Sequence, residues 1–145
     1  MYEEFVGKHI SYLDRYARRY YDKELKPYDI GGAQLRILML LYKMDGISQE
    51  LLAQTIKVDK TTIARTIKKL VDNGFILRQK DEKDRRSYRV FLNEKGKAIE
   101  PEMMKIFEKW EENLLYKFDD EQKKDVLKII GIMHENASEL MQDNR

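Results

Sequence analysis

Two groups of basic and hydroxyl side chains between Val58 and Asn93 have the chemistry of a polyanion-binding surface. The segment KTTIARTIKKL, which begins at Lys60, carries Lys, Thr and Arg side chains at the spacing of an α-helix. The segment DEKDRRS, which begins at Asp81, places two adjacent arginines in a charged loop. Arginine can hold guanine O6 and N7 with two hydrogen bonds, threonine can bond base edges or phosphates, and lysine neutralises phosphates. We therefore expect a helix that enters the DNA major groove and a loop that reaches the minor groove or the phosphates beside it.

A helix from about Lys60 to Asn73 is expected to position the first group. Asp59 is a favourable N-cap residue, and Asn73-Gly74 is a favourable C-terminal stop. The spacing of the apolar residues predicts a buried side made of Ile63, Ile67, Leu70 and Val71. The opposite side of the helix and its flanks carry the expected DNA contacts. Those directed to bases are Thr61, Thr62 and Arg65, and those directed to phosphates are Lys60, Lys68 and Lys69.

The adjoining segments predict a second helix before this one and a hairpin after it. Ser48 is a favourable cap for a helix from Gln49 to about Ile56, with three residues expected to be buried: Leu51, Leu52 and Ile56. Asp45-Gly46 predicts a turn, and Ile47 can add a short third strand. Residues 75–80 and 88–93 predict an antiparallel hairpin whose inner face is Tyr88, Val90 and Leu92. The loop between these strands is too long for a two-residue turn, so we expect it to project.

Basic charge is concentrated in this middle part of the chain. From Lys57 to Lys97 there are 13 Lys or Arg residues against 6 Asp or Glu residues, and elsewhere there are 15 against 20. The middle thus has a formal charge of +7 and the remainder −5. A basic centre between acidic flanks is typical of a polyanion-binding module attached to helices with another task. The alternative is an ordinary solvated surface, but that interpretation does not account for the helix and hairpin that carry the charge.

Helices are also expected at both ends of the chain. The first runs from about Glu3 to Glu24, the second from about Gly32 to Tyr42, and a longer one from Glu94 to Lys117. Pro101 either marks the true start of this longer helix or kinks it. The last helix, capped by Asp119, has an apolar stripe that is broad for a terminal helix with little domain left to cover. We therefore expect the terminal helices to pack against each other and against a second subunit.

Composition excludes several other classes of protein. The chain has no cysteine, so it forms no disulfide and no thiolate metal site, and its longest apolar runs are too short for a membrane-spanning helix. His9 and His134 do not lie in a metal-ligand pattern, and we expect no metal or other cofactor. The sequence shows no nucleophile with its base and no phosphate-binding glycine loop, so it does not indicate an enzyme. A cytoplasmic protein is expected.

The predicted elements and the loop sequence resemble the MarR family, the multiple-antibiotic-resistance regulators. Asp84-Arg85-Arg86, followed by Val90, Leu92 and Gly96, is similar to the Asp-x-Arg wing signature of that family. The resemblance implies a mainly α-helical winged helix-turn-helix, with six helices and a two- to three-stranded wing. It implies that Arg86 reaches into the minor groove and that Asp84 helps to hold the wing. Asn93 stands where the family often has threonine, and we expect it to cap the next helix.

The resemblance also implies a homodimer, a regulatory ligand and a division of labour along the chain. Residues 1–31 and 98–145 would form the dimerisation domain, and residues 32–97 the DNA-binding domain. The expected function is a transcriptional regulator, most simply a repressor that binds a pseudo-palindromic DNA operator as a homodimer. The alternative is a winged-helix module for protein–protein contact without DNA binding. Such a module tends to lose basic charge on the helix and wing, whereas this chain keeps it.

A small aromatic or anionic effector could bind near the tyrosine-rich N-terminal third of the chain. The candidate residues are Tyr12, Tyr16 and Arg36, because aromatic rings near an arginine suit an aromatic anion. The alternative, which we favour, is that these rings pack in the dimer interface, where aromatic side chains are common.

Overall fold

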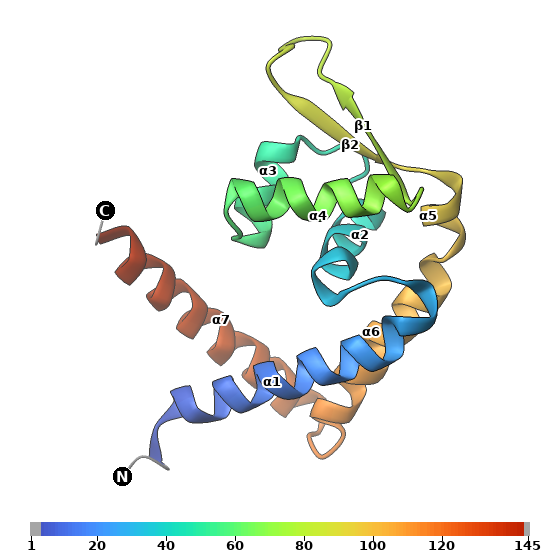
Figure 1. The fold of residues 1–145 in the computed structure, drawn as a ribbon. Helices are drawn as coiled ribbons and strands as arrows, with labels where there is room; N and C mark the ends of the chain where they lie inside the picture. Colours follow the sequence, from blue (N-terminus) through green and yellow to red (C-terminus); the bar gives the residue numbers. More distant parts are fainter. Residues whose placement is uncertain (1–3, 144–145) are drawn as a thin grey trace. The chain divides into compact units, whose positions relative to one another are not determined.

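A computed structural model of the chain describes residues 4–143 (Figure 1). The expected helix start at Glu3 and the outer ends of the two expected dimerisation segments, at residues 1–3 and 144–145, lie outside this range. The chain divides into two compact units, one ending at Glu108 and the other beginning at Lys109. Among residues 4–143, no helix has both the length and the apolar character needed to cross a bilayer.

The first unit contains a winged helix preceded by a long helix. In chain order its elements are α1 (Val6–Leu25), the 3₁₀ turn η2 (Lys26–Tyr28), α2 (Gly32–Lys43), α3 (Gln49–Ile56), α4 (Lys60–Asp72), β1 (Ile76–Lys80), β2 (Tyr88–Leu92), α5 (Glu94–Ala98) and the first part of α6 (Glu100–Leu115). The strands pair antiparallel, with Ile76 opposite Leu92 and Lys80 opposite Tyr88. An isolated bridge between Ser48 and Arg89 adds a third, minimal strand. The mainly α-helical winged-helix fold is thus confirmed.

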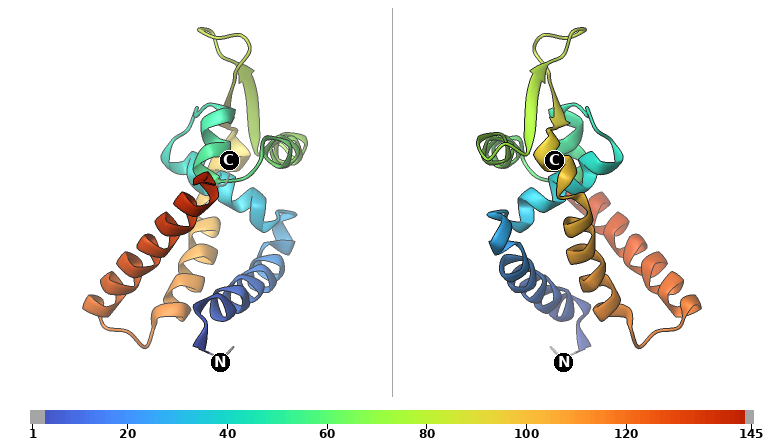
Figure 2. Two further views of the ribbon diagram at one scale, coloured as in Figure 1. Left: turned by 90° about the vertical axis from the view of Figure 1, so that its left-hand side faces the viewer. Right: turned by 90° about the vertical axis from the view of Figure 1, so that its right-hand side faces the viewer.

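The core of this unit lies between α2, α4 and the base of the hairpin. Leu38 and Leu41 of α2, Leu70 of α4 and Val90 of β2 are all completely buried. On β2 the predicted inner face is confirmed, because Tyr88 is half-buried while Val90 and Leu92 are buried. The hairpin extends beyond α4 in both views of Figure 2, so its base belongs to the core while its loop projects from it.

Two residues expected in the core are exposed. Val71 of α4 is 38% exposed, and Leu51 of α3 is 44% exposed. Each residue of a helix points about 100° away from its neighbour. Because Leu70 and Leu52 point directly into the core, Val71 and Leu51 are turned toward the sides of their helices. The buried side of α4 contains Thr66 instead, whose hydroxyl donates to the Thr62 carbonyl at 2.8 Å.

The expected helix from Glu94 to Lys117 is two helices, so there are seven α-helices among the described residues rather than six. α5 ends at Ala98, Ile99 forms its C-cap, and α6 begins at Glu100. Pro101 therefore lies in the first turn of α6, where a missing N–H costs no intrahelical hydrogen bond. Of the two possibilities stated for Pro101, marking a helix start is the correct one.

A close contact between backbones explains why position 96 is a glycine. A Cβ atom at Gly96 would lie 2.3 Å from the Phe75 carbonyl oxygen and 3.2 Å from Leu92 Cδ2. The Gly96 carbonyl also accepts a hydrogen bond from the Tyr42 hydroxyl at 2.8 Å. Burial, followed by the nearby carboxylates of Glu100 and Glu102, raises the pKa of Tyr42 well above its ordinary value, so this hydroxyl keeps its proton.

We expect Gly96→Ala to destabilise the winged helix. The new methyl group would displace backbone rather than a flexible side chain, and overpacking of this kind costs about 1–3 kcal/mol. Thermal unfolding followed by circular dichroism measures the effect. Gly7→Ala is the matched control, because a Cβ at Gly7 meets nothing within 4 Å. Equal melting temperatures for Gly96→Ala and the unmodified protein would contradict this account of the contact.

The second unit consists of the end of α6 and the whole of α7 (Asp120–Asp143). Asp119 caps α7 as expected: its Oδ1 accepts from the Gln122 N–H at 2.8 Å, while Gln122 Oε1 accepts from the Asp119 N–H at 3.0 Å. The apolar side chains of α7 are largely exposed, including Leu127, Ile129, Ile130, Ile132, Leu140 and Met141.

Candidate nucleic-acid interface

The N-terminus of α4 is fixed by the predicted cap. Asp59 Oδ1 accepts from the Thr62 N–H at 2.8 Å, and Asp59 Oδ2 accepts from the Thr62 hydroxyl at 2.8 Å. These two hydrogen bonds, that of the N–H first, lower the pKa of Asp59 and keep its carboxylate charged. The hydroxyl proton of Thr62 is therefore used within the cap, and what Thr62 can offer a DNA base is its oxygen as an acceptor and its methyl group.

The structure gathers some of the expected contact residues of α4 on one exposed face. A groove of about 610 Å³ is lined by Thr61, Ala64, Arg65, Ile67, Lys68, Val71 and Arg78, six of them from α4 and Arg78 from β1. We call this the α4 groove. Lys68 Nζ lies 2.8 Å from Asp72 Oδ2, with both side chains well exposed. Such an exposed pair contributes little to stability, so the lysine can exchange this partner for a phosphate.

The remaining lysines of α4 lie elsewhere. Lys60 lines a smaller groove that also contains Arg86, Ser87 and Tyr88, so it is close to the wing. Lys69 lines a cavity on the other flank of the helix, together with Thr66 and Asp72. The six expected residues of α4 therefore do not form one surface. Thr61, Arg65 and Lys68 share the α4 groove, and Thr62 is held in the cap by Asp59. Lys60 faces the wing, and Lys69 lies apart from both.

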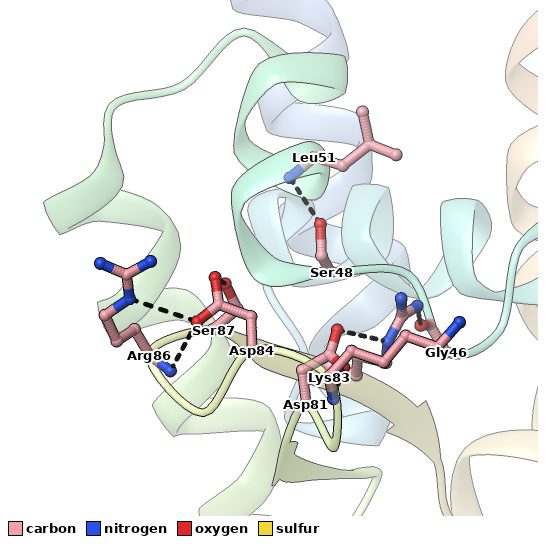
Figure 3. A network of polar contacts seen from close by, with 9 residues as sticks. Gly46, Ser48, Leu51, Asp81, Lys83, Asp84, Arg86 and Ser87 are labelled. Atoms are coloured by element: carbon pink, nitrogen blue, oxygen red, sulfur yellow. Dashed lines mark hydrogen bonds and ion pairs between the residues drawn. The ribbon is translucent and has the colours of Figure 1, made fainter.

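A single carboxylate organises the tip of the wing. Asp84 Oδ1 accepts from the Arg86 N–H at 3.1 Å and from Arg86 Nε at 3.3 Å (Figure 3). Asp84 also accepts from Ser87, through Oδ2 from its hydroxyl at 3.4 Å and through its carbonyl from its N–H at 2.9 Å. The Arg86 side chain is nevertheless 93% exposed, so its outer nitrogens face solvent. Arg85 is also exposed.

The base of the wing is held by a second carboxylate, which the sequence analysis did not single out. Asp81 Oδ1 accepts from the Lys83 N–H at 2.9 Å (Figure 3), and Asp81 Oδ2 accepts from Arg89 Nε at 2.9 Å. Arg89 also donates to the Gly46 carbonyl at 2.8 Å, which joins the wing to the turn before α3. The Lys83 N–H, and then the charge of Arg89, lower the pKa of Asp81. An aspartate two residues before a backbone donor is the available sequence signal, because this spacing is typical of an Asx turn.

Asn93 does not cap α5 with its side chain, contrary to expectation. It occupies the N-cap position, but its Nδ2 donates to the Ile76 carbonyl at 3.1 Å and to the Gly74 carbonyl at 3.4 Å. Its backbone N–H donates to the Phe75 carbonyl at 2.9 Å. Asn93 thus ties the end of β2 to the start of β1. The side-chain amide can donate to two carbonyls, which a helix cap does not require.

The expected effector residues are solvent-exposed on two different helices. Tyr12 and Tyr16 lie on α1, where the guanidinium carbon of Arg15 is 5.7 Å from the Tyr12 ring centre and that of Arg19 is 6.0 Å from the Tyr16 ring centre. Arg36 is exposed on α2. Within the described part of the chain, no three His, Cys, Asp or Glu side chains are grouped so that they could hold a metal ion.

A capped helix beside a charged hairpin, both mounted on a small helical core, defines a winged helix-turn-helix protein. The model of the MarR family matches residues 32–88. The chain is 37% identical over 113 residues to the uncharacterized HTH-type transcriptional regulator YybA of Bacillus subtilis (strain 168), covering 78% of this chain and 75% of YybA. The chain is 53% identical in sequence to a MarR transcriptional regulator from Methanosarcina mazei Go1, whose crystal structure superposes with a TM-score of 0.86. The match covers 94% of this chain and 99% of that one. The crystal structure of the transcriptional regulator SlyA is 28% identical, with a TM-score of 0.90, over 97% and 99% of the two chains.

The chain belongs to the MarR family. It is accordingly a DNA-binding transcriptional regulator of the winged helix type, and not an enzyme.

Proposed function

We propose that the chain binds a pseudo-palindromic operator in double-stranded DNA as a homodimer, and that it represses transcription until a small effector binds. The observation that carries the proposal is the pairing of two exposed cationic features on one unit. These are the face of α4 that bears Arg65 and Lys68, and the Arg86 side chain that Asp84 holds at the wing tip. α4 has the size and chemistry to enter a major groove of DNA. Arg86 has the size and charge to enter the adjacent minor groove.

Within this proposal the contacts have separate tasks. Thr61, Thr62 and Arg65 face base edges, while Lys60, Lys68 and Lys69 neutralise phosphates. Among these, Lys69 is the least favourably placed, because it lines the cavity on the far flank of α4. In the wing Arg85 and Arg86 contact DNA and Asp84 positions Arg86. The rival function, a protein-binding module, predicts no affinity for duplex DNA at low salt.

Two exposed apolar surfaces support the homodimer. On α1, Phe5, Val6 and Ile10 are each at least half exposed, and most of the apolar residues of α7 are exposed as well. Exposed apolar area on this scale marks an interaction site. A two-fold dimer presents two copies of α4 and reads two half-sites about one helical turn apart. We assign residues 1–31 and 98–145 to dimerisation and residues 32–97 to DNA binding.

The proposed effector is a small aromatic anion that binds on α1. Its support is the exposure of Tyr12 and Tyr16 beside Arg15 and Arg19, which offers ring faces and positive charge to an aromatic anion. A thermal-shift series with phenolic carboxylates tests it, because a ligand that binds the folded state raises the melting temperature.

Selection of bound sites from a random duplex pool, followed by mobility-shift titration, tests the main proposal. We expect an inverted repeat to be enriched, and we expect binding to weaken with salt by a log–log slope of about −0.9 for each phosphate neutralised. Enrichment of a single unpaired half-site would contradict the homodimer. No retention of any duplex at low salt would contradict DNA binding and favour the protein-binding module.

A further inference from the structure

A further arginine, Arg78, lies on the hairpin surface between α4 and the wing tip. Arg78 lies on β1 opposite Val90, on the hairpin face that is buried at Ile76 and Val90 and opens to solvent beyond them. Its side chain completes the α4 groove, where it is the only contribution from the hairpin. The groove has no acidic residue in its lining and holds three cations: Arg65, Lys68 and Arg78.

An aromatic ring holds this arginine in place. The guanidinium carbon of Arg78 is 4.0 Å from the ring centre of Tyr88, which lies diagonally across the hairpin. A guanidinium over a ring face is attracted by the electrons of the ring, and this contact uses none of its five N–H donors. Within residues 4–143, Arg78 forms no salt bridge and no side-chain hydrogen bond. The ring therefore orients Arg78 while leaving all of its donors available.

Arg89 of β2 and Arg86 of the wing tip differ from Arg78, because each donates to an aspartate of the wing. Arg89 donates to Asp81 and to the Gly46 carbonyl, so its hydrogen bonds serve the base of the wing. Arg86 donates through Nε to Asp84 and keeps its outer nitrogens free. Arg78 is the arginine of this hairpin that is fixed without being paired to an anion of the protein itself. An oriented, unpaired guanidinium beside a cationic groove is suited to an external oxyanion such as phosphate.

We propose that Arg78, positioned by Tyr88, binds the phosphate backbone that separates the major groove occupied by α4 from the minor groove occupied by the wing. This assignment rests on the proposed function. In B-form DNA a single sugar-phosphate strand lies between a major groove and the minor groove next to it. When α4 and Arg86 occupy the two grooves, that strand must cross the surface between them, and Arg78 lies on that surface. The contact fixes the register of the protein on DNA and carries no sequence information.

Mobility-shift titrations of variants, on the selected operator and on a random duplex over a salt series, test this assignment. We expect Arg78→Ala to weaken binding about 10-fold or more on both duplexes, because a hydrogen bond to a charged group is lost at each site. The salt slope should become shallower by about 0.9 for each copy of Arg78 in the complex. Arg78→Lys should keep the slope and lose part of the affinity, since lysine keeps the charge but lacks the planar donor pair.

Two further variants separate positioning from folding. Tyr88→Phe keeps the ring face and should bind DNA as the unmodified protein does, whereas Tyr88→Leu removes the ring and should weaken binding while Arg78 keeps its charge. Lys43→Ala is the control, because Lys43 is an exposed cation of the same unit on α2 to which no DNA or effector contact is assigned. Melting temperatures of Arg78→Ala and Lys43→Ala should both equal that of the unmodified protein.

The outcomes distinguish this assignment from the proposed function. If Arg78→Ala keeps both its affinity and its salt slope while Arg86→Ala loses affinity, the assignment is wrong and the proposed function stands. If Arg78→Ala loses affinity only for the operator, Arg78 reads a base and the phosphate assignment is wrong. If the unmodified protein binds no duplex, the proposed function fails and the assignment fails with it.

Discussion

Ile130→Glu is expected to dissociate the proposed homodimer and to abolish tight operator binding. Ile130 lies near the centre of the apolar stripe of α7 and is 54% exposed in the single chain. A glutamate there would be buried without a partner in the interface, which costs several kcal/mol. A monomer can hold only one half-site. Two linked binding modules bind about 10²- to 10⁴-fold more tightly than one module alone, so the loss of operator affinity should be of that size.

Sedimentation velocity and mobility-shift titration of the same samples measure the two effects together. Lys128→Glu is the matched control: it places a glutamate on the same helix, on the side away from Ile130, where Lys128 is exposed. We expect this control to stay dimeric and to bind the operator. If Ile130→Glu sediments as the unmodified protein does and binds with the same affinity, α7 does not form the interface.

The sequence was most informative where local chemistry decides the structure. Ser48, Asp59 and Asp119 cap their helices through contacts with residues three positions ahead, and these caps could be predicted from residue type and spacing. Alternation along the second strand likewise predicted which of its side chains face the core. Each capping partner lies in the first turn of its own helix, and alternation is a property of the strand itself, so neither prediction needs knowledge of the tertiary fold.

The sequence was least informative where a residue has more than one possible hydrogen-bond or packing partner. Asn93 is at a helix N-cap, but its amide bonds the carbonyls of Gly74 and Ile76, which the fold brings close. The break at Ile99 is a single residue long, so it barely disturbs the helical spacing that predicted one helix. Which flank of α4 the hairpin covers could not be predicted either. The hairpin lies on the flank of Arg65 and Lys68, so Arg78 joins the α4 groove, while Lys69 lines the cavity on the other flank.

The wing and α4 also differ in how they are held, and this difference decides how variants should behave. α4 belongs to the core through Ile63, Ile67 and Leu70, so changes on its outer face leave its position intact. The wing loop has no such packing and depends on hydrogen bonds to Asp84 at its tip and to Asp81 at its base. Loss of one carboxylate should therefore alter the DNA-binding geometry of the wing without a large change in global stability.

Arg86→Ala is expected to lower operator affinity by about 1–3 kcal/mol at each half-site, because a well-placed arginine contact in a groove has that value. The melting temperature should not change, since the Arg86 side chain is 93% exposed. Mobility-shift titration at fixed salt measures the affinity. Unchanged affinity would remove Arg86 from the interface.

A double-mutant cycle of Asp84→Ala and Arg86→Ala tests whether Asp84 acts on DNA binding through Arg86. Asp84→Ala removes a negative charge close to DNA, which by simple electrostatics should strengthen binding. It also releases the Arg86 N–H and Nε and the Ser87 hydroxyl, which should weaken binding by increasing the freedom of Arg86. We expect the second effect to dominate, because an ordered arginine loses less entropy on binding. Asp84→Ala should then weaken binding in the presence of Arg86 and have no such effect in Arg86→Ala, where no guanidinium remains to be positioned. Tighter binding by Asp84→Ala alone would show that its charge, rather than its hold on Arg86, governs the wing.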